Sequence, residues 1–383
     1  MSAVGAVRAL GAAPAAAAAG LPRPAESGID HIVVLTMENR SFDHLLGWLP
    51  GADGTQAGLR YADRRGVAHS TYPLAPDFQG CGHSDPDHSY AGSRVAYDGG
   101  RCDGFLRAGN NDLYAIGYYT QPDLAFLGAA APAWTVCDRY FASIMGPTMS
   151  NRMYLHGGRT DRTDDLPLPS GLRTIWDALA ERRIAARYYR RNFSYLALWG
   201  TKYLRITRTF SDFQHDCRTG RLPGVSYVDP AYTLPVLGLG SDDHPPSDIR
   251  AGEWFMAQVY RAVTTSPAWP RTLLVITFDE WGGFFEHVPP THAPDVSVRY
   301  SLRGFRVPTL LVSPFARRGH VDHTVFDHAS IVKMIEWRFG LRALSVRDAA
   351  AANLAAALDF SVRDVRAPAF SVPRVATSKP CRS

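Results

Sequence analysis

The sequence predicts an α/β fold with a largely parallel central sheet, and two observations support this prediction. Apolar runs rich in β-branched residues alternate along the 383-residue chain with segments whose apolar residues recur at helical spacing, as in βαβ units. The clearest runs are apolar throughout, which is typical of strands that helices cover on both faces. Because 46% of the residues are hydrophobic, a large core is possible, and we expect one domain with insertions.

The expected strands form a clear group and a weaker group. The clear strands are His31–Met37, Thr272–Phe278 and Val307–Val312. The weaker candidates are Trp134–Cys137, Ala185–Tyr189 and Val225–Val228.

Four helices are indicated by apolar spacing and by capping residues. Ser41 can cap a helix over Phe42–Trp48, and the segment Thr174–Arg183 is amphipathic. Residues 248–265 place their apolar side chains on one stripe. A fourth helix is expected to follow Asp327 and to stop at Gly340.

The organisation of the chain follows from these elements. We expect a single catalytic domain over residues 29–360, with insertions around 50–112 and 190–246 that are rich in Gly, Pro, Asp, His and Tyr. Connections of this length inside a compact domain are usually functional caps. Residues 361–383 form a basic tail with five basic residues and one acidic residue.

Charge and hydropathy exclude two classes of protein. Lys and Arg number 41 against 36 Asp and Glu, but this excess lies in the terminal segments, so residues 29–360 are formally neutral. We therefore expect no nucleic-acid partner. No strongly apolar run reaches the ~18 residues of a membrane span.

The first 28 residues leave two interpretations open. Residues 12–19 are alanine except for Pro14, and small residues of this kind precede signal cleavage sites. Arg8 alone supplies a charged start, so the segment is either an export-signal remnant or a disordered tail. Secretion or attachment to the cell envelope is the localisation we expect, and a cytoplasmic location remains open.

The five cysteines predict neither a zinc cage nor a full disulfide framework, because their number is odd and no CxxC spacing occurs. One disulfide, Cys81–Cys102, would close part of the first insertion.

Acidic side chains follow two of the clear strands directly. Glu38 and Asn39 come after the first strand, and Asp279 and Glu280 come after the second. Ligand sites in α/β sheets collect at the carboxyl ends of strands, and oxygen ligands of this type suit a hard divalent cation. The alternative is that each carboxylate only caps the next helix or turn.

Further polar residues add hydroxyl, amide and imidazole groups. Thr148 and Ser150 follow a Gly-Pro turn, and Asn151 and Arg152 are donors that could hold an anion. The alternative for this segment is an ordinary helix start. His88 and His244 lie in polar loops, where a histidine is either surface decoration or a proton donor in phosphoryl chemistry.

Several stretches resemble the successive motifs of the bacterial phosphoesterase family, which holds phosphatidylcholine-type phospholipases C, related acid phosphatases and the plant non-specific phospholipases C. The resemblance covers about residues 28–345 in order. The stretches that carry it include IDHIVVLTMENRSFDHLLG, YFASIMGPTMSNRMYLHGG, VITFDEWGGFFEHVPP and the segment from RVPTLLVSP to IEWRFGL, and the blocks ENRSFDH and FDEWGG are the specific ones. It implies an alkaline-phosphatase-like three-layer sandwich with long cap loops and a metal-assisted covalent mechanism.

The resemblance also implies roles for individual residues. One divalent cation, Ca, Mg or Zn, would be held by Glu38, Asn39, Asp279 and Glu280. Thr148 would be the nucleophile, Asn39 with Asn151 and Arg152 would bind the substrate's anionic group, and His88 and His244 would contact the phosphoryl group and supply the leaving-group proton.

Two positions depart from the family pattern. Ser150 replaces a common proline and adds a second hydroxyl, and Asp243 replaces one histidine of a frequent pair.

The expected function is hydrolysis of phospholipid phosphodiesters. The alternatives are an acid phosphatase acting on monoesters and a catalytically silent binding protein of the same fold. A serine acyl hydrolase is not expected, because no plausible serine of this sequence lies in a G-x-S-x-G motif. Apolar surface for a lipid could come from a group of aromatic residues, and the alternative is that they belong to the core or to turns: Tyr114, Tyr118, Tyr119, Trp281, Phe284 and Phe285. The basic tail is either solvated or in peripheral contact with an anionic membrane. The oligomeric state stays open.

Overall fold

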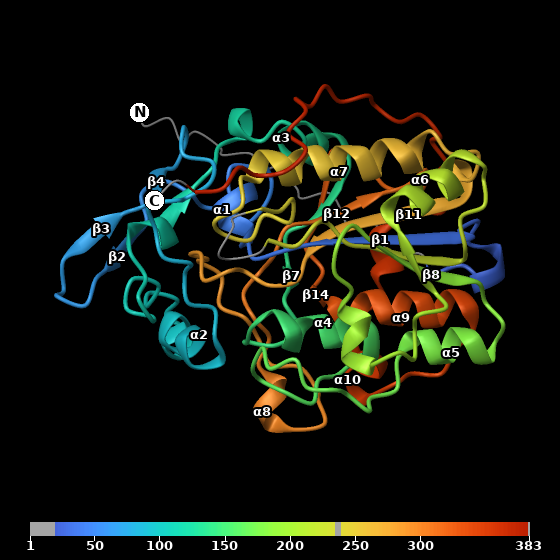
Figure 1. Ribbon diagram of the computed structural model, residues 1–383, viewed down its shortest axis with the longest axis horizontal. Helices are drawn as coiled ribbons and strands as arrows, with labels where there is room; N and C mark the ends of the chain where they lie inside the picture. Colours follow the sequence, from blue (N-terminus) through green and yellow to red (C-terminus); the bar gives the residue numbers. More distant parts are fainter. Residues whose placement is uncertain (1–19, 234–238, 382–383) are drawn as a thin grey trace, which may run out of the picture.

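In the computed structural model, residues 20–233 and 239–381 are described, and they form a sandwich around one central sheet (Figure 1). Eight strands of these residues form the sheet, in this order across it: β13 (His320–Asp322), β6 (Thr135–Cys137), β12 (Thr309–Val312), β11 (Thr272–Phe278), β1 (His31–Met37), β10 (Val225–Val228), β8 (Ala186–Arg190) and β9 (Thr207–Thr209).

The strands are mostly parallel, as predicted. From β11 to β9 all neighbours run in the same direction, whereas β12 is antiparallel to both β11 and β6. In the centre, Leu35 of β1 is opposite Ile276 of β11 and Val228 of β10. Every residue of β11 is buried, and so is β1 after its first residue. Both strands are therefore covered on both faces, which explains their continuous apolar sequences.

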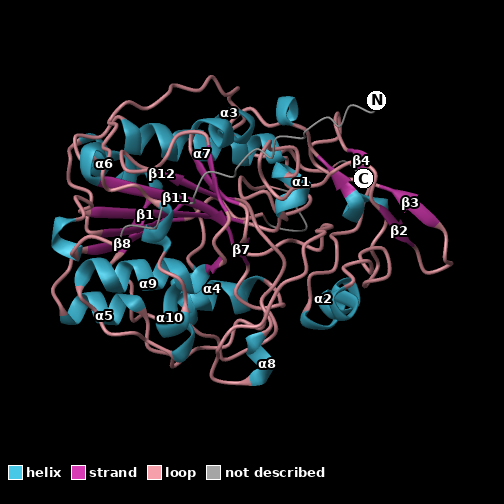
Figure 2. Cartoon of the chain, turned by 180° about the vertical axis from the view of Figure 1, so that it is seen from behind, coloured by secondary structure: helices cyan, strands magenta, loops and turns pink. Residues whose placement is uncertain are grey.

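Helices cover both faces of the sheet and make the three predicted layers. In Figure 1, α3 (Leu127–Ala130), α6 (Phe210–Arg218) and α7 (Ile249–Thr264) lie above the sheet. The opposite layer holds α4 (Thr148–Gly157), α5 (Ile175–Glu181), α9 (His328–Phe339) and α10 (Val346–Ala350), and the reverse view in Figure 2 shows the same separation.

The sequence signals for most central elements are confirmed within one or two residues. The third clear strand starts at Thr309 rather than Val307, because Pro308 has no N–H to donate to a ladder. Helix α9 starts after Asp327, whose carboxylate accepts the N–H of Ala329 at 2.9 Å, and its C-cap is Gly340 at φ 63°.

Shorter elements surround one end of the sandwich and include the first insertion. They are α1 (Phe42–Leu46), α2 (Tyr90–Tyr97), α8 (Val298–Ser301), β2 (Arg60–Ala62), β3 (Ala68–Ser70), β4 (Tyr72–Pro73), β5 (Gly117–Tyr118), β7 (Tyr140–Phe141) and β14 (Phe326–Asp327). The pairs β2–β3 and β4–β5 form small two-stranded sheets, which extend from the left side of Figure 1. The proposed leader region falls largely on residues 1–19, which lie outside the described residues.

The C-terminal segment runs across the surface of the α7 layer and returns to the first insertion (Figure 1, red). The Tyr260 hydroxyl donates to Pro368 O at 2.7 Å, and Ser378 N–H donates to Gly240 O at 3.0 Å. Cys81 forms a disulfide with Cys381, 300 residues away. The expected Cys81–Cys102 pairing is therefore wrong, since Cys102 is a buried free thiol.

No helix among the described residues is long and apolar enough to cross a membrane.

Removal of the disulfide should loosen the C-terminal segment. Because the cross-link closes a very long loop, we expect Cys81→Ser to lower the free energy of unfolding by about 2–4 kcal/mol. Thermal unfolding with and without reductant measures this change. Reductant should destabilise the wild type and leave Cys81→Ser unaffected; equal melting of the wild type in both conditions would contradict the cross-link.

Candidate active site

The predicted metal-ligating residues meet at the carboxyl ends of two central strands. Glu38 and Asn39 follow β1, and Asp279 and Glu280 follow β11, its parallel neighbour. Asn39 N–H donates to Asp279 Oδ1 at 3.2 Å, which ties the two strand ends together. Three of these side chains carry carboxylates, and all four residues are buried. The arrangement places several oxygen ligands in one water-poor space.

Asn39 has a left-handed backbone conformation, with φ 60°. Such a conformation is uncommon outside glycine and often marks a functional position. Gly282 packs against it, because a Cβ at Gly282 would lie 2.0 Å from the Asn39 carbonyl oxygen. Because Gly282 has no side chain, the segment after Asp279 and Glu280 can pack closely against the backbone of Asn39.

Thr148 is the first residue of α4 and faces Asn39. Its Oγ1 donates to Asn39 Oδ1 at 3.4 Å, while Asn39 Nδ2 lies 3.3 Å from His88 Nε2. The positive end of the α4 dipole favours negative charge at this hydroxyl. Ser150, the alternative hydroxyl, donates to Arg162 O at 3.2 Å. Only Thr148 of the two hydroxyls is hydrogen-bonded to the acidic cluster.

The two residues expected to hold the substrate's anionic group are engaged by the protein itself. Asn151 Oδ1 accepts the N–H of Ile144, and its Nδ2 donates to Gly146 O at 2.8 Å. The guanidinium of Arg152 is hydrogen-bonded to carboxylates of the protein. The structure thus gives Asn151 and Arg152 supporting positions, because their polar groups already have buried partners.

Arg152 is the positive centre of the site. Its guanidinium donates to Glu38 Oε1 at 2.9 Å, to Asp279 Oδ2 at 3.1 Å and to Asp229 Oδ1 at 3.2 Å. It also lies 4.8 Å from the ring centroid of Tyr195 and 5.3 Å from that of Tyr232. These cation–π contacts add to the binding of the guanidinium.

Sequence analysis missed three members of this network. Asp229 directly follows β10, the other parallel neighbour of β1, so the strand-end pattern would have found it. The Tyr195 hydroxyl donates to Glu38 Oε1 at 3.0 Å. Tyr195 and Tyr232 come from the second insertion, and no local signal in the sequence identifies them.

Burial disfavours the charged forms of these carboxyl groups despite the presence of Arg152. Burial and the charge of Asp279 raise the pKa of Glu38 well above its usual value. Burial likewise raises the pKa of Glu280 well above its usual value and that of Asp229 to about 6. Among the described residues, Glu280 Oε1 is buried without a hydrogen-bond partner. An unpartnered, desolvated oxygen beside further carboxylates fits a bound divalent cation.

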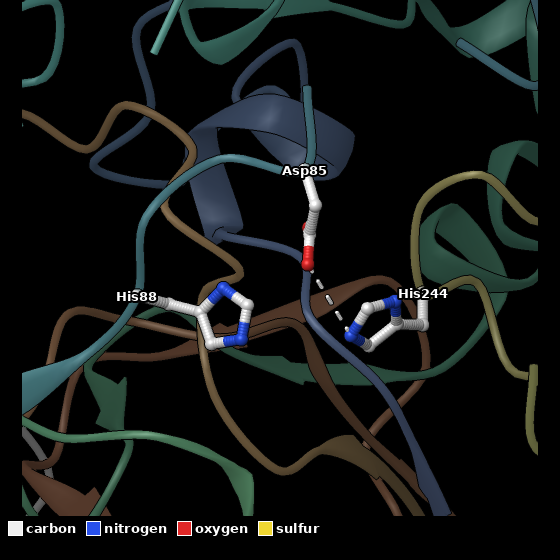
Figure 3. A group of neighbouring side chains, drawn as sticks. All are labelled: Asp85, His88 and His244. Atoms are coloured by element: carbon white, nitrogen blue, oxygen red, sulfur yellow. Dashed lines mark ion pairs between the residues drawn. The ribbon is translucent and has the colours of Figure 1, made fainter. Parts of the chain in front are cut away.

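His88 and His244 face each other across the opening of the site, with Asp85 beside them (Figure 3). Their ring centroids are 5.9 Å apart. His88 Nε2 is 3.9 Å from Glu280 Oε1, and His244 Nε2 is 3.7 Å from Asp85 Oδ2. Burial acts to lower the pKa of His88, but Glu280 and Asp85 outweigh it and raise the pKa to about 9.

Asp243, which replaces a frequent histidine, is turned away from this pair. Its side chain packs against α7, since a Cβ at Gly252 would lie 1.9 Å from Asp243 Oδ1. Its backbone oxygen accepts the Nε–H of Arg40 at 2.8 Å. The presence of Asp243 in place of a histidine therefore affects the packing and hydrogen bonds behind His244.

A cavity of about 630 Å³ opens beside the nucleophile candidate. Pro147 and His88 border it, and its acidic lining residues are Asp85, Asp87, Asp164 and Asp165. Asp165 also accepts the N–H of Met149, the residue after Thr148, at 2.8 Å. The cavity therefore lies beside the start of α4.

The aromatic residues expected to provide a lipid-binding surface belong to the core. They are buried in the structure: Tyr114, Tyr118, Tyr119, Trp281, Phe284 and Phe285. Tyr114 and Phe284, for example, pack edge to face at 5.2 Å. The carboxylates of the cavity, rather than these rings, are next to the catalytic candidates.

Comparisons with known proteins agree with this chemistry. The phosphoesterase family model matches residues 29–342. Non-specific phospholipase C1 of Arabidopsis thaliana is 31% identical over 377 residues, which cover 86% of this chain and 70% of that protein. Phospholipase C B of Mycobacterium tuberculosis is 30% identical over 421 residues, which cover 87% of this chain and 78% of that protein.

Among solved structures, a Vibrio parahaemolyticus protein in the alkaline phosphatase superfamily aligns with 85% of this chain and 69% of its own, at 9% identity and a TM-score of 0.42.

Removal of the Arg152 charge should destabilise the whole molecule. Arg152→Met leaves three buried carboxylates without their cation, and we expect the free energy of unfolding to fall by about 3–5 kcal/mol. Denaturant unfolding of the purified variant measures this loss. Arg173→Met is the control, because the exposed Arg173–Glu181 pair should contribute less than about 1 kcal/mol. Similar losses in both variants would contradict the central role of Arg152.

Proposed function

The chain belongs to the phosphoesterase family, and from this premise we propose that it is a phospholipase C that cleaves phospholipid phosphodiesters through a covalent intermediate on Thr148. Membership of the family and the phospholipase C relatives make it a hydrolase of phosphate esters. The finer proposal depends on one observation. The Thr148 hydroxyl, at the start of α4, lies 3.4 Å from Asn39 Oδ1 in the acidic cluster.

In the proposed first step, Thr148 Oγ1 attacks phosphorus and the bond from phosphorus to the diacylglycerol oxygen breaks. The Thr148 proton passes to solvent water during this attack, and the departing oxygen takes a proton from a histidine. Water then attacks the phosphothreonine and gives a proton to that histidine, while Thr148 Oγ1 regains a proton from solvent as the phosphorylated headgroup leaves. Two in-line displacements of this kind give net retention at phosphorus.

The cofactor that we propose is one divalent cation, Ca, Mg or Zn, held by Glu38, Asn39, Asp279 and Glu280. The unpartnered Glu280 Oε1 and the raised pKa values of Glu38 and Glu280 support this assignment. When bound, such a cation lowers the pKa of a nearby hydroxyl and neutralises phosphoryl oxygens. Arg152 donates to two of these carboxylates, Asp279 and Glu38, and holds them in place.

We propose that His88 and His244 contact the phosphoryl group and that one of them is the general acid. With a pKa of about 9, His88 carries a proton at neutral pH. His88 Nε2 lies 3.3 Å from Asn39 Nδ2, and His244 Nε2 is paired with Asp85 (Figure 3). Protonation of the leaving oxygen by such a group accelerates the departure of an alkoxide.

The acidic cavity supports a diester substrate over a monoester. A phosphodiester carries a second substituent that needs space beside phosphorus, and the cavity of about 630 Å³ provides that space. Its carboxylates would attract a positively charged headgroup. Contact with a membrane remains a proposal, for which the exposed Arg363, Arg366 and Arg374 could add attraction to anionic lipid.

We also propose that the protein works outside the cytoplasm, either secreted or at the cell envelope. The Cys81–Cys381 disulfide supports this location, since stable disulfides form in oxidising compartments.

Substitution of the two hydroxyl residues tests the nucleophile. Thr148→Val keeps the side-chain shape, and we expect kcat/KM to fall by at least about 10³-fold. Ser150→Ala is the matched control, since it should lose only one hydrogen bond, at about 1 kcal/mol of stability, with turnover preserved. Steady-state kinetics and mass spectrometry of a trapped phosphoenzyme provide the readouts. An inactive Ser150→Ala beside an active Thr148→Val would transfer the role to Ser150.

Comparison of a diester with a monoester tests the substrate class. We expect faster hydrolysis of p-nitrophenyl phosphorylcholine than of p-nitrophenyl phosphate, and loss of both activities after treatment with a chelator. Added divalent cation should restore them. Preference for the monoester would identify a phosphatase, and activity that survives exhaustive chelation would contradict the metal requirement.

A further inference from the structure

Two loops far apart in the sequence bring a carboxylate and two imidazoles together at the opening of the active site. One ligand atom from each of Asp85, His88 and His244 lies within 4.8 Å of the other two. Figure 3 shows the two rings and the Asp85 carboxylate converging on a shared space. Asp85 is exposed and the histidines are partly buried, so an ion could reach them from solvent.

The hydrogen bonds of the two rings define which nitrogen is free. His88 Nδ1 is 2.7 Å from Pro86 O, and His244 Nδ1 is 2.6 Å from Pro245 O. A carbonyl oxygen can only accept, so each Nδ1 must carry the proton of the neutral ring. In the neutral rings each Nε2 then carries the lone pair; Nε2 of His88 lies 3.3 Å from Asn39 Nδ2, and Nε2 of His244 lies 3.7 Å from Asp85 Oδ2. A ring N–H donated to a backbone carbonyl is the usual support of a metal-binding histidine.

The carboxylate of Glu280, which belongs to the strand-end cluster, also borders this space. Glu280 Oε1 is fully buried, has no hydrogen-bond partner within the described part of the chain, and lies 3.9 Å from His88 Nε2. An unpartnered carboxylate oxygen at this distance could approach a cation bound by the two imidazoles. The donors in reach are therefore two nitrogens and carboxylate oxygens.

A second cluster of possible metal ligands differs, because its carboxylates are already paired with an arginine. Asp43, Glu286 and His287 also have ligand atoms within 4.8 Å of one another. However, Arg306 donates to Glu286 Oε1 at 2.7 Å and to Asp43 Oδ1 at 3.3 Å. The guanidinium already neutralises that cluster, whereas no arginine or lysine is paired with Asp85 among the described residues.

We infer that Asp85, His88 and His244 form a binding site for a borderline-soft divalent cation such as Zn²⁺, separate from the all-oxygen site at the strand ends. Two imidazole nitrogens and a carboxylate are a common zinc ligand set, with one position left for Glu280 or water. The bound ion occupies the same Nε2 lone pairs that take up the catalytic proton. Zinc at this site therefore inhibits the enzyme, an effect that rests on the proposed function, whereas the binding itself does not.

Binding is tested on the full-length protein with Mg²⁺ present to occupy the oxygen site. Isothermal titration with ZnCl₂ and the visible spectrum of added Co²⁺ report the nitrogen-containing site directly. We expect Asp85→Asn to weaken zinc binding by about tenfold or more. His83→Gln is the matched control, since His83 lies in the same loop and pairs with Asp112 instead. Equal zinc affinity in all three proteins would overturn the site.

Inhibition is measured separately, as hydrolysis in excess Mg²⁺ with increasing Zn²⁺. Asp85→Asn should need about tenfold or more zinc for the same fractional inhibition, with each protein compared with its own zinc-free activity. Zinc that binds at this site without lowering activity would overturn the inhibitory role. If no ester is hydrolysed but zinc still binds with this dependence on Asp85, the proposed function fails while the metal site stands.

Discussion

The guanidinium of Arg152 is the interaction on which the rest of the site depends. Three neighbouring parallel strands end in buried carboxylates, Glu38, Asp279 and Asp229, whose mutual repulsion in a dry environment would otherwise prevent their approach. Arg152 lies four residues after Thr148 in α4, so both side chains project from the same face of the helix. The ion pairs that neutralise the strand ends therefore also hold the nucleophile candidate against them.

One arginine does not balance this much acid, and the imbalance is useful for catalysis. Glu280 adds a further buried carboxylate whose pKa, like that of Glu38, is raised well above its usual range. A site with surplus desolvated oxygen ligands gains more from a cation than an evenly paired one does. Arg152 thus offsets part of the cost of burying the cluster, and the oxygen of Glu280 that it leaves unpartnered is one that the proposed cation would bind.

The sequence predicted the parts of the molecule whose signals are local. Continuous apolar strands and capping residues identified β1, β11 and α9 nearly to the residue, and acidic residues at strand ends identified Glu38 and Asp279. Partners supplied from distant segments were missed, because nothing near Tyr195 or Cys381 indicates a contact with Glu38 or Cys81. Arg152 illustrates the same limit, since its residue type suggests an anion-binding group and only the fold shows that the anions are the protein's own.

The group of ligands at the strand ends and the group at the opening differ in donor type, and this difference separates their chemistry. At the strand ends, the ligands are carboxylate and amide oxygens, which favour hard cations. At the opening, the carbonyls of Pro86 and Pro245 fix both imidazoles by accepting from Nδ1, which leaves Nε2 as the nitrogen for which a proton and a softer cation compete. A histidine arranged to deliver a proton to a leaving oxygen is, for the same geometric reason, arranged to bind zinc. Asp85 stabilises either positive charge, so it strengthens the competition rather than deciding it.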